Sequence, residues 1–347
     1  MVAYATMTRR DFLTRTAAAG ALARVRGYVP FGLFAPVSVP TASAEPAAST
    51  GQAAATATGM FVSLNGALTA GKNVGWPELA RLAARVGYGG VDWSLAPAQA
   101  AGLEATRALF AELAIKPTIA NLPMARPLPF AGEQAAFQDA LVKLGDDAAF
   151  SAAIGCRKMM VVLPPTGPQP KDDYRKVVRD RIAAVSEVLQ KSNVRLGLEF
   201  LGVQQFRAGR ADAPPPNPFI WTLPETVALA KDCGTNIGVI LDVWHWHHSG
   251  GTTADITATE ASRIVHVHLS DARPMAPEAV RDNMRVMPGE GSIDLTGFLR
   301  ALKTIGYADG VSPEPLGRIP ADMTAEDAAK LGLETTLAVM RKAGVAR

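Results

Sequence analysis

From residue 60 onward, short apolar runs alternate with longer amphipathic stretches, and this alternation restricts the fold more than any other feature. Each run is typical of a buried strand, and each following stretch has helical spacing. Strands are expected at 60–64, 89–94, 116–120, 157–163, 194–200, 237–242, 263–270 and 310–315. Helices are expected at 76–86, 99–113, 133–153, 172–192, 223–233, 252–261, 294–305 and 324–343. Eight such units predict an α/β fold, a single-domain (β/α)₈ barrel over residues 60–347, in preference to an open doubly wound sheet.

Two further features of the barrel region concern the loops. No Gly-x-Gly-x-x-Gly segment follows the first expected strand, which argues against a dinucleotide-binding fold. Two loops are much longer than the others: LGVQQFRAGRADAPPPNPFIW after the fifth strand and DARPMAPEAVRDNMRVMPGEGSID after the seventh. Loops of that length in a compact barrel usually serve as lids or binding loops, so we expect both to have such a role.

The first 44 residues differ in composition from the rest of the chain. Their charged residues are Arg9, Arg10, Arg15, Arg24 and Arg26 against Asp11. The stretch TRRDFLTRTAAAGALA resembles a twin-arginine export signal, although two arginines interrupt its apolar part. An Ala-Ser-Ala site ends at Ala44, and residues 45–59 have the composition of a disordered linker. The sequence therefore predicts an exported, periplasmic protein, with cytoplasmic residence as the alternative.

Charge and cysteine usage exclude several classes of partner. The formal net charge is +3, and the leader alone carries five arginines against one aspartate, so the remainder is close to neutral. A near-neutral barrel gives no reason to expect nucleic acid as a partner. No charge-free apolar run is long enough for a transmembrane helix, so no stable membrane insertion is expected. Cys156 and Cys233 lack a paired spacing and are expected to be buried rather than bridged or catalytic.

Four ionisable side chains stand at the carboxyl ends of four successive expected strands: Glu199, Asp242, His268 and Glu314. Chemistry in a (β/α)₈ barrel lies at those ends, so the four should converge at the mouth of the barrel. Three carboxylates this close would raise one another's pKa unless a cation neutralised them. The sequence therefore predicts one divalent metal ion, and one nitrogen with three oxygen ligands suits Mn²⁺, Mg²⁺, Co²⁺ or Zn²⁺.

All five histidines lie between residues 245 and 268. His266 and His268 are two apart on an expected strand, so both face the barrel interior, with His268 nearer the mouth. His268 is therefore the preferred ligand, and His266 is expected to be a hydrogen-bonded interior histidine. His245 lies just past the strand that ends at Asp242, where it is expected to contact a substrate oxygen. Neighbouring Trp244 forms either a wall for a sugar ring or packing beneath the loop.

Taken together, the segments GLEF, LDVWH, HVHLSD, PGEGSIDL and SPEP resemble the sugar phosphate isomerase/epimerase family, the xylose isomerase-like TIM barrels. The resemblance covers roughly residues 60–343 and implies a metal-dependent isomerase or epimerase with a carbohydrate substrate. In ketose 3-epimerases of that family the four matching positions bind one metal, which polarises the carbonyl and holds an enediolate. The two glutamates exchange protons on opposite faces of the substrate carbon, so Glu199 and Glu314 would be the catalytic acid and base.

The resemblance also implies substrate contacts. An arginine shortly before the Pro-Gly segment contacts substrate in those enzymes, and Arg285 is the matching residue, with Arg273 or Arg281 as alternatives. Asp92 stands where the family commonly has glutamate and would keep a polar, substrate-facing role at shorter reach.

Other reactions on the same barrel remain open. Relatives that bind two or three metals need histidines from early strands, and residues 1–244 contain none. The single-metal chemistry also serves dehydratases acting on 3-dehydroshikimate and lyases that cleave 3-keto-glycosides, and export slightly favours the lyases. A barrel that binds a sugar without turning it over is the remaining alternative, but a mere binder does not need two opposed glutamates. Association of the chain into a homo-oligomer is left open.

Overall fold

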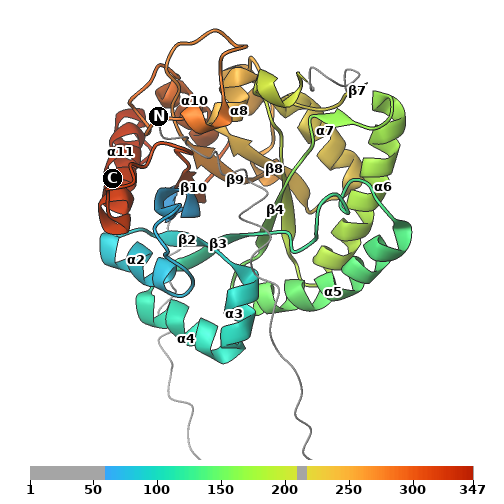
Figure 1. Cartoon of the computed structure of the whole chain (residues 1–347), viewed down its shortest axis with the longest axis horizontal. Helices are drawn as coiled ribbons and strands as arrows, with labels where there is room; N and C mark the ends of the chain where they lie inside the picture. The colour runs from blue at the N-terminus through green and yellow to red at the C-terminus, as the bar shows by residue number, and fades with distance from the viewer. Residues whose placement is uncertain (1–58, 209–216, 347) are drawn as a thin grey trace, which may run out of the picture. The chain divides into compact units, whose positions relative to one another are not determined.

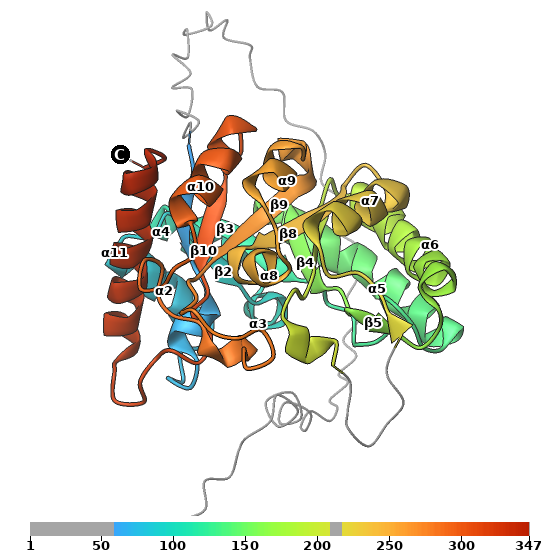
Figure 2. The same ribbon diagram turned by 90° about the horizontal axis from the view of Figure 1, so that it is seen from above.

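The computed structural model describes residues 59–208 and 217–346. Within these residues eight parallel strands close into a barrel in the order β1-β10-β9-β8-β6-β4-β3-β2, with helices around it (Figures 1 and 2). The strands are β1 (Phe61–Leu64), β2 (Gly90–Trp93), β3 (Lys116–Asn121), β4 (Lys158–Val162), β6 (Arg195–Glu199), β8 (Ile237–Asp242), β9 (Ile264–Leu269) and β10 (Gly310–Pro313). Every strand expected from the sequence is present, which confirms the (β/α)₈ barrel. The expected leader and linker lie outside the described residues, apart from Gly59.

The strands are built mainly from apolar side chains that are buried. Every residue of β8 and of β9 is buried, as expected for parallel strands covered by helices on one side and by the barrel interior on the other. Gly238 allows β8 to approach its neighbour closely, since a Cβ there would lie 2.3 Å from the carbonyl oxygen of Arg263. The close pairing of β8 with β9 places Asp242 in register with His268.

The helices follow the expected alternation with three differences. They are α2 (Glu78–Val86), α3 (Leu95–Ala101), α4 (Leu103–Leu113), α5 (Gln134–Ala153), α6 (Lys171–Gln190), α7 (Leu223–Cys233), α8 (Val243–His248), α9 (Thr253–Thr257), α10 (Leu295–Thr304) and α11 (Ala325–Ala343). The expected helix 99–113 is two helices, because Gly102 has a φ of +92° between them. The expected helix 252–261 ends early, at Thr257. Helix α8, directly after β8, was not expected.

The long loop between β9 and α10 is held in place by Asp271. Its backbone pairs with that of Val286, with N–H···O distances of 3.0 Å in both directions. Its carboxylate accepts hydrogen bonds from the amides of Ala272, Gly289, Gly291 and Ile293. The amides of the Pro-Gly-Glu-Gly turn therefore bind a side chain of the protein itself, and the turn is structural.

Three further observations concern the loops, the cysteines and the helices. A short antiparallel pair, β5 (Thr166–Gly167) with β7 (Asn217–Pro218), joins the loop after β4 to the loop after β6 and was not expected. Cys156 and Cys233 are buried and unbridged, as expected. Among the described helices, none has both the length and the apolar character needed to cross a bilayer.

Candidate functional site

Four ionisable side chains meet at the carboxyl ends of β6, β8, β9 and β10. Glu199 and Asp242 are the last residues of β6 and β8, and His268 is the second-last residue of β9. Glu314 follows β10 directly, and its amide donates a 2.8 Å hydrogen bond to the carbonyl of Leu269, which fixes its position. Each side chain offers one ligand atom within 4.8 Å of those of the others. The structure thus brings together the four residues that the sequence assigned to a metal.

The imidazole of His268 lies between two of these carboxylates. Its Nδ1 is 3.0 Å from Glu199 Oε1 and 3.5 Å from Glu314 Oε2. Burial alone would lower the pKa of His268, but the carboxylates of Glu314, Glu199 and Asp242 outweigh it and raise that pKa to about 10. The carboxylates are themselves poorly solvated. Burial raises the pKa of Asp242 to about 6 and raises that of Glu314, although nearby cations oppose both shifts.

Arg285 supplies the second cation of this group. Its side chain is buried, with an exposed fraction of 1%. Nη1 donates 2.8 Å hydrogen bonds to Asp242 Oδ2 and Glu314 Oε2, and Nη2 donates a 2.7 Å bond to Asp282 Oδ1. Burial opposes the charge of the guanidinium, but these carboxylates raise its pKa above the ordinary value. We call Glu199, Asp242, His268, Arg285 and Glu314 the mouth cluster.

His245 lies beside the mouth cluster because of helix α8. The Asp242 carboxylate caps this helix, with Oδ1 accepting a 2.9 Å hydrogen bond from the Trp244 amide. The helix turns the buried His245 side chain toward Arg285, whose Nη2 is 3.2 Å from His245 Nε2. The same ring nitrogen is 3.7 Å from Asp242 Oδ2. His245 is therefore next to the residues expected to bind the metal, as its spacing indicated.

Sequence reasoning did not find Asp282, the third carboxylate that contacts Arg285. Its only sequence signal is its position three residues before that arginine, in the long loop. The two alternative arginines lie elsewhere. Arg281 donates to the carbonyls of Glu278 and Val280 in its own loop, and Arg273 lines a neighbouring cavity.

Asp92 lies in a second polar group inside the barrel. Its carboxylate accepts hydrogen bonds from Ser63 at 2.8 Å, Asn65 at 3.0 Å and Ser312 at 3.0 Å. His266 shares a 2.7 Å hydrogen bond with the Ser312 hydroxyl, in keeping with an interior histidine. Burial raises the pKa of Asp92 and lowers that of His266. We call Ser63, Asn65, Asp92, Thr118, His266 and Ser312 the inner network, which includes a 2.8 Å hydrogen bond between the Ser63 and Thr118 hydroxyls.

The donor set of the mouth cluster fits a divalent ion. Carboxylate oxygens and an imidazole nitrogen bind divalent ions at about 2.0–2.6 Å, so one ion can contact atoms that lie within 4.8 Å of one another. His268 would use Nδ1, which faces Glu199 and Glu314. Asp92, His266 and His268 also approach within 4.8 Å, but their one carboxylate already accepts three hydrogen bonds. The mouth cluster is therefore the better candidate for a metal centre.

Comparisons with known proteins agree with this architecture. Residues 80–342 match the model of the xylose isomerase-like TIM barrel family. The inosose isomerase of Bacillus velezensis is 30% identical over 172 residues, which is 50% of this chain and 58% of that relative's length. The match thus spans little more than half of that enzyme.

Solved structures extend the likeness over the whole barrel. A xylose isomerase domain protein from Alicyclobacillus acidocaldarius has a TM-score of 0.72 and 28% identity, over 82% of this chain and 99% of the other. The IOLI protein, whose structure has a bound zinc atom, has a TM-score of 0.68 and 23% identity over 82% and 99%. The chain belongs to the xylose isomerase-like TIM barrel family.

Proposed function

We propose that this barrel is a divalent-metal-dependent isomerase or epimerase that transfers protons at a carbon next to the carbonyl of a sugar or cyclitol. The observation that carries the proposal is the pair of glutamates on either side of His268. Glu199 comes from β6 and Glu314 from the end of β10, the outer two of four neighbouring strands that hold the mouth cluster. The likeness to an inosose isomerase supports a polyhydroxylated ketone as substrate.

The residues that would hold the metal are Glu199, Asp242, His268 and Glu314, and Mn²⁺, Mg²⁺, Co²⁺ or Zn²⁺ would suit them. A bound ion would act as a Lewis acid on the carbonyl and so make the adjacent carbon more acidic. The Arg285 guanidinium, within the cluster, and the neighbouring His245 imidazole would orient hydroxyl oxygens of the substrate.

Each glutamate keeps one oxygen for proton transfer. Glu199 faces His268 through Oε1, and Glu314 faces His268 and Arg285 through Oε2. Among the described residues, no hydrogen bond engages Glu199 Oε2 or Glu314 Oε1. One carboxylate would remove the proton from the carbon, and the other would deliver a proton to the opposite face or to the neighbouring carbon. Delivery to the opposite face of the same carbon is epimerisation, and delivery to the neighbouring carbon is isomerisation.

The test is metal analysis of the purified protein followed by proton exchange in D₂O. Ketoses, ketose phosphates, an inosose and 3-keto-glycosides would be incubated with the protein and followed by NMR. We expect one metal per chain and metal-dependent entry of deuterium next to a carbonyl. Elimination products from a 3-keto-glycoside would assign a lyase instead. Metal binding without exchange or elimination on any of these compounds would contradict the proposal and favour a sugar-binding barrel.

A further inference from the structure

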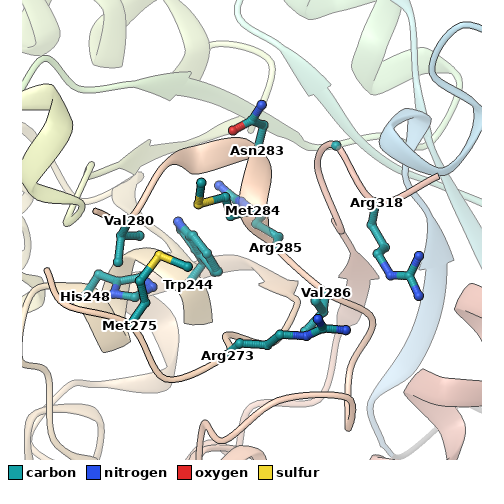
Figure 3. A pocket seen from close by; sticks show the side chains of 11 residues that line it. Trp244, His248, Arg273, Met275, Val280, Asn283, Met284, Arg285, Val286 and Arg318 are labelled. Carbon is teal, nitrogen blue, oxygen red and sulfur yellow. The ribbon is translucent and has the colours of Figure 1, made fainter. Parts of the chain in front are cut away.

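A cavity of about 430 Å³ adjoins the mouth cluster (Figure 3). Its walls come from α8, from the long loop between β9 and α10, and from the segment after β10. The side chains that matter here are those of Trp244, Arg273, Met275, Met284, Arg285 and Arg318. A volume in this range suits a drug-sized ligand and exceeds the space that one small polar ring requires.

The cavity and the mouth cluster share a wall. Arg285 lines the cavity and also donates to Asp242 and Glu314. Trp244 follows Asp242 by two residues, and Arg318 follows Glu314 by four. A molecule whose reacting carbon lies at the mouth cluster would therefore place an adjoining group in the cavity.

Exposed apolar side chains gather at this cavity. Met275 is 46% exposed and Met284 is 44% exposed, and both line the cavity together with Trp244 (Figure 3). The described chain has one further exposed large hydrophobic residue, Val142 on α5. Methionine side chains adapt to irregular ligands, and their sulfur atoms make favourable contacts with aromatic rings. Trp244 is itself buried, with an exposed fraction of 2%, so the two methionines supply most of the apolar surface, and they favour an apolar ligand.

The arginines of the cavity favour an aromatic ring over a phosphate. Arg318 pairs with Glu290 at 3.3 Å, and the carboxylates of Asp242, Asp282 and Glu314 surround Arg285. Arg273 alone makes no ion pair with a carboxylate in the described part of the chain, so little positive charge is left for a dianion. A guanidinium plane also stacks on aromatic faces. Arg285 already lies over the Trp244 ring, with its Cζ 5.5 Å from the ring centroid.

We infer that the cavity binds an aromatic group attached to the sugar or cyclitol, so that the substrate is an aryl-substituted compound rather than a free or phosphorylated sugar. This inference rests on the proposed function, because it places the reacting ring at the mouth cluster. The aromatic ring would lie among Trp244, Met275 and Met284, with the Arg273 guanidinium able to stack on it.

Binding of non-reacting probes to the metal-loaded, full-length protein tests the inference. The probes are phenyl β-D-glucopyranoside, methyl β-D-glucopyranoside and glucose 6-phosphate. The two glucosides carry no ketone, and glucose 6-phosphate tests whether the cavity prefers an anionic group. We expect phenyl glucoside to bind about 10- to 100-fold more tightly than methyl glucoside in calorimetric titrations, because the phenyl ring is removed from water. In methyl NMR spectra, phenyl glucoside should shift the Met275 and Met284 signals. Equal affinities, tighter binding of glucose 6-phosphate, or no methyl shift at millimolar phenyl glucoside would overturn the inference.

A matched pair of variants separates the cavity from general effects. Met275→Ser combined with Met284→Ser should reduce the phenyl-to-methyl affinity ratio to about one, because it removes the apolar contact area. Val142→Ser changes the exposed hydrophobic residue outside the cavity and should keep the full ratio. Deuterium exchange on a phenyl 3-keto-glycoside, measured beside unsubstituted ketoses, reports on the proposed function alone. Exchange without a phenyl preference would defeat only this inference, and a phenyl preference without exchange would defeat only the proposed function.

Discussion

The barrel holds two buried polar groups that differ in how their charges are balanced. In the inner network the one carboxylate, Asp92, accepts hydrogen bonds from two hydroxyls and an amide. Its histidine, His266, has a pKa well below the ordinary value because of burial and is therefore neutral. In the mouth cluster three carboxylates share two cations, His268 and Arg285, and Asp282 adds a fourth negative charge from the loop.

This difference bears on which of the two groups would gain from a bound cation. The inner network satisfies its carboxylate with neutral donors from β1, β10 and the turn after β1, so it needs no ligand to be stable. The mouth cluster has more negative than positive charge, and burial raises the pKa of both Asp242 and Glu314. A buried excess of negative charge is unfavourable without a counter-ion. The mouth cluster is thus the group that gains most from a divalent cation, and four tests probe this contrast.

The largest effect is expected from Arg285→Met. In the absence of metal this change leaves Asp242 and Glu314 without their buried cation, and breaking a buried ion pair costs about 3–5 kcal/mol of unfolding free energy. Metal affinity should rise, because no guanidinium competes for the carboxylates. Denaturant unfolding in chelator and calorimetric titration with Mn²⁺ measure the two effects.

Arg107→Met is the control for this change, because it removes an exposed ion pair with Glu104 and should cost less than about 1 kcal/mol. If Arg285→Met were as stable as the wild type without metal, Arg285 would not be the counter-ion of the mouth cluster.

The next effect concerns proton transfer. Glu199→Gln and Glu314→Gln keep the shape of the side chain but remove its basicity, so each should slow solvent deuterium exchange by at least ~10²-fold. Metal content must be measured on the same samples, since each change also alters an expected ligand. Glu104→Gln, an exposed glutamate on α4, is the matched control and should exchange at the wild-type rate. Near-normal exchange in both metal-loaded variants would show that other groups transfer the proton.

The fold could be predicted because its determinants are local. Each strand is an apolar run that the chain itself delimits, and eight of them in alternation allow few other architectures. Helix α8 was missed because VWHWHH lacks the spacing of an amphipathic helix, and its cap, Asp242, was assigned only to the metal. The pair β5 and β7 was missed because two-residue strands depend on contacts between distant loops.

The strand ends are the part of the site that elementary rules predict from the sequence, whereas Arg285 was reached only through the family resemblance. Glu199, Asp242, His268 and Glu314 follow from one rule, that strand ends converge at the barrel mouth. The position of Arg285 and the contact from Asp282 depend on the path of a long loop. That path is fixed by Asp271 through backbone pairing with Val286 and through amides of the Pro-Gly-Glu-Gly turn. Such long-range contacts leave no periodic pattern in the sequence.

Metal removal provides the third test. An ion present at 100 times its Kd stabilises the folded state by about 2.7 kcal/mol, so chelation should lower the unfolding free energy of the wild type by about that amount. Asp242→Asn should respond far less to chelation, since it lacks one expected ligand carboxylate. A wild type whose unfolding curve is the same with and without chelator would argue against a metal in the mouth cluster.

The smallest effect is expected from Asp92→Ala in the inner network. The change removes the shared acceptor of Ser63, Asn65 and Ser312, but Ser63 keeps its contact with Thr118 and Ser312 keeps its contact with His266. The Asn65 amide is then the donor left without this acceptor, and one buried unsatisfied donor costs about 1–3 kcal/mol, so the unfolding free energy should fall by a value in that range. Metal content should stay at one ion per chain, because the four expected ligands are intact. Ser63→Ala is the partial control, since it removes one donor and keeps the carboxylate. Loss of the metal from Asp92→Ala would mean that the inner network and the mouth cluster act as one site, and the contrast between them would have to be abandoned.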